Sequence, residues 1–385
     1  MIQNYLNTSR YIIAHQVFDE HYKHIFNSLK KNHVDLELVV TYSLNRDCEL
    51  FFTDEKKILI YDQYLGETFN DLNKLFFSAK NENDGLLYCM KLAGEYLQLG
   101  GYLIPSLAFS NAFSNNRKNI LQEADNLIEI RSTFTGIQEY FIIAHELCHC
   151  ALSLNKNEKL FKSTKEFIRE NCLDVFNQDD FPTEKFIDVF TDSLIEGLKI
   201  SNPDKTSISD KVRKQIDIDP EQFLLGRRHL IEEREDFIEE IICDEIATNT
   251  LLSLKIAPTN IIIRGVFIGL MNLRLLSLVN RMVNNIKSEK KLNDFFFESL
   301  LRLSVFRKLF ETRIKLFYGN EKMIELSELL TKDNKRYSKI LTNQLLFSIQ
   351  VDINDMINHK NDITNKKYSF EEKKELNNLI QKILR

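Results

Sequence analysis

Hydrophobic residues recur every three or four positions along most of this 385-residue chain. Such spacing is typical of amphipathic helices that bury one face. Only 11 Gly and 5 Pro interrupt it, so the connections between helices are expected to be short. The pattern predicts helices over residues 8–31, 62–77, 84–99, 104–124, 260–288, 290–318, 321–332, 334–358 and 369–384.

One β region stands out near the N-terminus. Three short apolar runs are predicted as strands, namely Leu36–Tyr42, Glu49–Thr53 and Lys57–Tyr61. A further alternating run, Leu127–Arg131, is predicted as a fourth strand just before a long apolar helix. That helix is expected to begin near Gly136, because Thr135 and Gln138 have the spacing of a capping box.

These elements predict a mainly α fold of the α+β class, with a small N-terminal sheet and a helical C-terminal layer. Three parts are expected: an N-terminal α/β part over residues 1–155, a helical insertion over 156–220, and a helical part over 221–385. With 43% hydrophobic and 28% charged residues, the chain has the composition of an ordinary soluble globular protein.

His145-Glu146-Leu147-Cys148-His149 is the stretch that carries the most chemical information. On a helix, positions i and i+4 share one face, so the imidazoles of His145 and His149 can bind one metal ion. Because the chain has only 8 histidines, a chance match has odds of roughly one in a hundred. The alternative is a pair of hydrogen-bonded core histidines with Glu146 at the helix surface. Burying these groups unpaired would cost several kcal/mol, and metal coordination usually recovers that cost.

A second helical stretch, residues 239–247, offers a third ligand. Catalytic zinc sites use three protein ligands and keep one open position. Glu240 and Asp244 again stand at i and i+4, and apolar residues follow Asp244, which places Glu240 near the core. The alternatives are the other acidic residues of this charged run and, less favoured, the nearby cysteines: Glu239, Asp236, Glu245, Cys148, Cys150 and Cys243.

The pairing of His-Glu-x-x-His with a later helical Glu-x-x-x-Asp resembles the gluzincin class of zinc metallopeptidases. The resemblance implies a zincin-like core with Zn²⁺ as cofactor, held by His145, His149 and Glu240. It implies that Glu146 takes the proton of the water that attacks a peptide carbonyl. It also implies that Asp244 orients one of the ligand histidines.

The resemblance covers two helices, about a tenth of the chain. Cys243 before the aspartate is similar to the motif of HtpX-related bacterial peptidases, but their hydrophobic spans are missing here. The long separation between His149 and Glu240 implies an insertion, and this layout is more similar to soluble phage-exclusion (Lit-like) peptidases. In zincins an edge strand near the active-site helix pairs with the extended substrate. Leu127–Arg131 is expected either to be such a substrate-aligning strand or to be an ordinary interior strand.

From this resemblance we expect a zinc-dependent endopeptidase that hydrolyses a peptide bond of an intracellular protein, in bacterial defence, toxicity or regulation. One alternative is a catalytically inactive or metal-structural zincin-fold scaffold that binds a protein partner. Another is a zinc hydrolase that acts on a non-peptide amide. The sequence leaves open which group stabilises the oxyanion, and the candidates by chemistry are His229, Arg264 and Tyr318.

The net charge and the targeting signals limit the expected partners and cellular location. The net charge of −5 gives no general attraction to nucleic acid or acidic membranes. No secretory pattern opens the sequence, and its most apolar windows, 140–154 and 261–271, are shorter than a membrane span. Six cysteines without a C-x-x-C pattern suit reduced thiols, so a cytoplasmic protein with a protein or peptide substrate is expected. The N-terminal histidines are interpreted as ordinary helix residues rather than a second metal site: His15, His21, His24 and His33.

Overall fold

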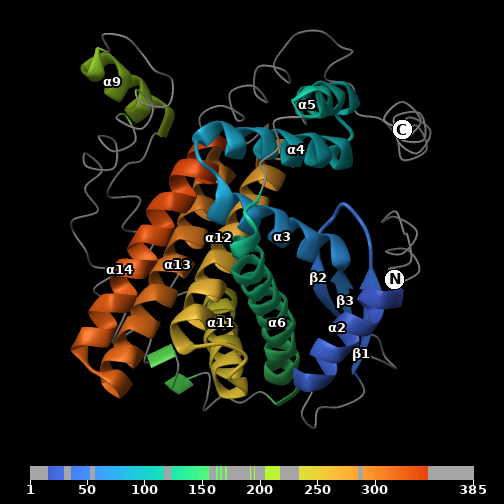
Figure 1. The fold of residues 1–385 in the computed structure, drawn as a ribbon, viewed down its shortest axis with the longest axis vertical. Coiled ribbons are helices and arrows are strands. Elements are labelled where there is room, and N and C mark those ends of the chain that lie inside the picture. The colour runs from blue at the N-terminus through green and yellow to red at the C-terminus, as the bar shows by residue number, and fades with distance from the viewer. Residues whose placement is uncertain are drawn as a thin grey trace.

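A computed structural model gives the fold of the chain (Figure 1). It describes residues 16–29, 36–52, 57–116, 123–155, 204–216, 234–284 and 289–345, with a few scattered positions between 162 and 195. Helices dominate these residues, and one three-stranded sheet accompanies them. The prediction of a mainly α fold with a small N-terminal sheet is therefore confirmed.

Helix α6, Asp125–Asn155, lies at the centre of the fold and contacts elements on both of its sides (Figure 1). Its apolar face is fully buried, with Phe134 and Ile143 at 0% exposure. On one side lies a helical layer of α11 (Glu235–Leu254), α12 (Thr259–Asn284), α13 (Glu289–Tyr318) and α14 (Asn320–Tyr337). On the other side lie α2 (Gln16–Leu29), α3 (Gln63–Ser78) and the sheet.

The sheet consists of β1 (Leu36–Thr41), β2 (Cys48–Phe52) and β3 (Lys57–Asp62). The strand order is β1-β3-β2, so β3 is central and β2 lies at an edge. β3 pairs parallel with β1 and antiparallel with β2. Leu59, Ile60 and Tyr61 of β3 are completely buried, as expected for a central strand. Asp62 then accepts a hydrogen bond from the backbone of Tyr64 and begins α3 directly after the strand.

The predicted fourth strand is wrong, because Leu127–Arg131 forms the first turns of α6. The predicted capping box is wrong for the same reason. Thr135 lies inside the helix and donates its hydroxyl to the carbonyl of Arg131 at 3.0 Å, while Gln138 bonds to Asn73 of α3. An alternating pattern over five residues is too short to distinguish a strand from a helix. Here the alternation arises because one apolar side chain, Ile128, lies on the exposed face of the helix, at 42% exposure.

A close approach between α6 and α12 fixes the central helix in place. A Cβ atom at Gly265 would lie 2.7 Å from Cγ2 of Ile137, so the missing side chain lets the two backbones approach. The Gln138 side-chain oxygen accepts hydrogen bonds from Asn73 at 2.9 Å and from Asn272 at 3.3 Å. This buried network joins α3, α6 and α12, two turns of helix before the histidine motif begins.

The remaining predicted helices are confirmed with shifts at their ends where the structure describes them. α4 (Glu82–Gly100) and α5 (Leu103–Asn115) follow α3, and α14 continues through residue 333 into a short π-helical turn, Ser338–Thr342. Of the predicted insertion over residues 156–220, the described part contains α9, Lys205–Ile216. Residues 346–385, including the helix predicted at 369–384, lie outside the described residues.

α12 is the one helix among the described residues that is long and apolar enough to cross a membrane. Within its stretch Thr259–Val283, the most apolar 18-residue window has a mean hydropathy of 1.8, and 72% of that window is buried within the protein. Arg264 lies inside this helix and forms a paired hydrogen bond with Asp333 of α14.

Candidate metal centre

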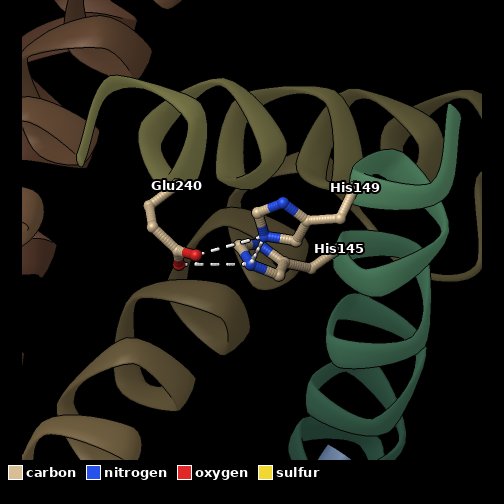
Figure 2. Close-up of side chains that lie close together, drawn as sticks. All are labelled: His145, His149 and Glu240. Atoms are coloured by element: carbon tan, nitrogen blue, oxygen red, sulfur yellow. Dashed lines mark hydrogen bonds and ion pairs between the residues drawn. The ribbon is translucent and has the colours of Figure 1, made fainter. Parts of the chain in front are cut away.

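His145 and His149 project from α6 toward α11, where Glu240 faces them (Figure 2). The two Nε2 atoms are 3.0 Å apart. Glu240 Oε2 lies 3.4 Å from Nε2 of His145, and Glu240 Oε1 lies 3.2 Å from Nε2 of His149. Three side chains from two helices therefore converge on one point. Within the described part of the chain, they form the group of side chains whose geometry can hold a metal ion.

The three side chains are near enough to one another to share a divalent ion. Zinc bonds to imidazole nitrogen and carboxylate oxygen are about 2.0–2.2 Å long, so ideal tetrahedral ligands lie about 3.3–3.6 Å apart. The two nitrogens are 3.0 Å apart and each lies 3.2–3.4 Å from a different oxygen of Glu240, so that one donor atom from each residue gives separations within 4.8 Å. Two imidazoles and one carboxylate are also a donor set of catalytic zinc sites, which keep a fourth position open.

The opposite nitrogen of each imidazole faces a second carboxylate. Nδ1 of His145 lies 3.0 Å from Oδ1 of Asp244, and Nδ1 of His149 lies 2.8 Å from Oε1 of Glu239. A carboxylate at Nδ1 keeps the proton there and leaves Nε2 free to bind a metal ion. Asp244 stands at the distance expected of an orienting carboxylate behind His145, where the contact is an ion pair whose angle at Nδ1 does not meet hydrogen-bond geometry. Glu239 contacts the far side of His149, so the geometry favours Glu240 over Glu239 as the third ligand.

The other acidic candidates on α11 are engaged elsewhere. Asp236 accepts a hydrogen bond from Nε of Arg234 at 2.7 Å, at the exposed start of the helix. Glu245 is buried and pairs with Arg313 of α13. The buried cysteines of α6 and α11 do not belong to the metal-capable group found among the described residues.

Arg302 of α13 completes the cluster, and the sequence did not reveal it. Its Nε and Nη2 donate to the two oxygens of Asp244 at 2.5 and 2.6 Å, and its Nη1 lies 2.8 Å from Oε2 of Glu240. The guanidinium thus offsets two neighbouring carboxylates that would otherwise repel each other. Arg302 stands 58 positions after Asp244 on a separate helix, so no local spacing could connect the two.

The charges of the cluster shift the pKa values of its members strongly. Burial alone would lower the pKa of His145, but the carboxylates of Asp244 and Glu240 raise it to about 10. Burial would raise the pKa of Glu240, yet His145, His149 and the charge of Arg302 hold it well below its usual range. A divalent ion would replace protons on the imidazoles, since histidine ligands bind in the neutral form.

Glu146 lies beside this cluster and lines a cleft of about 260 Å³ together with His145, Glu240 and Arg302. Burial raises the pKa of Glu146, which suits a group that takes a proton near neutral pH. Strand β2 forms a wall of the same cleft. Its residues Cys48 and Glu49 line the cleft together with Glu146, so the edge strand lies next to the catalytic candidate.

Two of the three candidates for oxyanion stabilisation do not fit. Arg264 pairs with Asp333, and Tyr318 is 61% exposed at the end of α13, so neither lines the cleft. His229 lies outside the described residues. The polar side chains that do line the cleft from α12 and α13 are Ser277, Asn280 and Arg302.

The site therefore combines a donor set for a divalent ion, a buried carboxylate beside it and a cleft that opens to solvent. These are the parts from which an enzyme builds metal-assisted hydrolysis. Helices α6, α11 and α13 carry the histidines, the carboxylates and Arg302, and α11 packs against both of the other two. Comparison of the chain with protein-family models, curated proteins and solved structures finds no match, so the chemistry of the site rests on its geometry.

Proposed function

We propose that this protein is a zinc-dependent endopeptidase with a zincin-like core, acting on a protein target in the cytoplasm. The observation that carries the proposal is the convergence of His145, His149 and Glu240 at separations of 3.0, 3.2 and 3.4 Å. None of the described cysteines forms a disulfide, which supports a reducing compartment. A role in defence or toxicity belongs to the same proposal.

The residues around the site divide the chemistry between them. A bound zinc ion would act as a Lewis acid on the peptide carbonyl and bring the pKa of a water molecule toward neutrality. Glu146, whose pKa is raised by burial, accepts the proton of the attacking water and delivers it to the departing nitrogen. Asp244 and Glu239 keep the two imidazoles oriented, and Arg302 holds Asp244 in place.

Strand β2 takes the place that Leu127–Arg131 was expected to fill. Among the described residues it lies at an edge of the sheet, antiparallel to β3, and its residues Cys48 and Glu49 line the cleft beside Glu146. An extended peptide can add to such an edge through main-chain hydrogen bonds, which tolerates many sequences. In this proposal β2 aligns the substrate, while the walls of the cleft select its side chains.

A second candidate is a scaffold whose cluster is structural. The observation that favours it is Arg302, which pairs with both Glu240 and Asp244 and so balances the carboxylates by itself. In that case the histidines and carboxylates form a satisfied ion-pair network, and zinc contributes nothing to function.

Peptide hydrolysis tests the proposal against this alternative. Wild-type protein loaded with zinc is incubated with a library of peptides and denatured proteins, and new termini are identified by mass spectrometry. Glu146→Gln should retain zinc and fold while hydrolysis falls by about 10²–10⁴-fold. Glu129→Gln, at an exposed position of the same helix, is the matched control and should leave hydrolysis unchanged. Equal hydrolysis by wild type and Glu146→Gln would refute the proposal.

A further inference from the structure

The turn between α13 and α14 exposes an unusual concentration of large apolar side chains. Seven large hydrophobic residues are exposed among the described residues, and four of them lie at this turn: Leu316 at 73%, Phe317 at 74%, Tyr318 at 61% and Ile324 at 46%. Gly319, with φ of 89°, makes the tight turn between the two helices. The tip of this helical hairpin therefore presents a protruding apolar knob, formed by Leu316 and Phe317.

An apolar groove lies directly beside the knob. It has a volume of about 280 Å³ and forms where α13, α14 and the start of α12 meet. Its apolar lining comes from Ile263, Ile314, Tyr318, Leu326 and Leu329. Because the knob and the groove lie on one surface of the same chain, two copies related by a two-fold axis can each place a knob in the groove of the other.

The exposed area is large for a single chain. The four side chains at the tip expose on the order of 400–500 Å², taking about 150–250 Å² for a whole aromatic side chain. The largest apolar patch on a typical monomer is about 300–600 Å² and is often functional. With the groove added, the surface approaches the lower range of about 600–800 Å² per partner that a specific interface buries.

The charges around the knob and groove are balanced. Lys315 and Lys322 carry positive charge, Glu321 and Glu325 carry negative charge, and all four are exposed. Lys322 and Glu325 already pair within α14 at 2.7 Å. A neutral rim gives no attraction to an anionic membrane or to nucleic acid, whereas equal numbers of both signs can face each other across a two-fold axis.

We propose that the α13–α14 tip is a self-association surface, in which Leu316 and Phe317 of each chain insert into the groove of a second copy. Helix α13 carries both Phe317 of the proposed contact and Arg302 of the metal centre, but at well-separated positions. Phe317 stands fifteen residues after Arg302, which is about 22 Å along α13. Self-association and the metal chemistry are thus separate properties, and either can fail without the other.

Sedimentation velocity over a range of protein concentrations tests this proposal. The full chain should show a reversible monomer–dimer equilibrium, and Phe317→Glu should weaken the dimer at least tenfold, because a buried carboxylate would have no partner there. Ile128→Glu is the matched control, since Ile128 is also exposed but lies at the start of α6, and its dimer constant should stay unchanged.

Any of four results would overturn the proposal. The wild type could remain monomeric up to several hundred micromolar, the dimer could survive Phe317→Glu, or both variants could weaken it equally. Binding of the monomer to neutral or anionic vesicles, lost in Phe317→Glu, would assign the tip to a membrane instead. Circular dichroism and zinc content should be the same in the wild type and both variants, which shows that any loss of dimer does not come from misfolding.

Discussion

Replacing Asp244 with Asn isolates the effect of the carboxylate behind His145. Asn has nearly the same shape, but one of its two terminal groups is a donor, so it cannot accept from Nε and Nη2 of Arg302 on two separate oxygens or fix the imidazole tautomer by charge. The comparison is Glu239→Gln, which changes the corresponding group behind His149. The two positions differ in burial, since the side chain of Asp244 is 3% exposed and that of Glu239 is 38% exposed.

Burial sets the expected magnitudes. Partners that orient metal ligands typically contribute about 10–100-fold in metal affinity, and tenfold corresponds to about 1.4 kcal/mol. Because Asp244 is buried, we expect the zinc affinity of Asp244→Asn to fall by about 30–100-fold. Solvent screens Glu239, so Glu239→Gln should lose about threefold or less. Asp244→Asn should also cost about 3 kcal/mol of folding free energy, because Arg302 loses its main partner in a largely buried pair.

Competition against a chromophoric zinc chelator measures both affinities, and urea unfolding measures the free energy of unfolding of each variant. The affinity is compared only under conditions in which circular dichroism shows the native helix content. Equal losses for the two variants would refute the reasoning from burial. An unchanged zinc affinity in folded Asp244→Asn would refute the orienting role itself.

Further predictions concern stability and metal linkage. Gly265→Ala should destabilise the protein by about 1–2 kcal/mol in urea unfolding, because the added Cβ would lie 2.7 Å from buried Ile137; Gly136→Ala, with nothing within 4 Å, should stabilise it by about 0.5–1 kcal/mol. His21 has a raised pKa because it bonds to Glu139, so its contribution should be complete below about pH 6.5 and be lost as the pH rises through that raised value. Since His21 is half exposed, the difference in unfolding free energy between wild type and His21→Gln should shrink by less than about 1 kcal/mol from pH 6 to pH 8, and an increase would contradict this sign. Zinc at a hundredfold excess over its dissociation constant should add about 2.7 kcal/mol to the free energy of unfolding. A melting temperature that is the same with zinc and with a chelator would contradict the presence of a zinc site.

Helical periodicity was sufficient to predict most of the fold. The long apolar repeats of α3, α4, α12 and α13 extend over many turns, so local sequence and final structure agree there. Leu127–Arg131 shows where the approach fails, because five alternating residues carry too little information and the rest of α6 decides their conformation. The packing of a long central helix overrode a weak local preference.

The candidate site was predictable in part. The spacing of His145, His149 and Glu240 indicates shared helix faces, and the structure brings the three together. Spacing could not choose between Glu239 and Glu240 with certainty, since the relative rotation of α6 and α11 decides which carboxylate meets the Nε2 atoms. Arg302 and strand β2 are joined to the site through tertiary packing alone, so no sequence pattern could have assigned them.

The zinc content of the purified protein tests the central claim most directly. Elemental mass spectrometry is applied to the wild type, His145→Ala, Glu240→Gln and Glu235→Gln, the last a matched control at an exposed position of α11. The account predicts about one zinc per chain in the wild type and in Glu235→Gln, and none in the other two variants when they are folded. A folded wild type that binds no zinc after dialysis against it, or full zinc retention in Glu240→Gln, would contradict the three-ligand site.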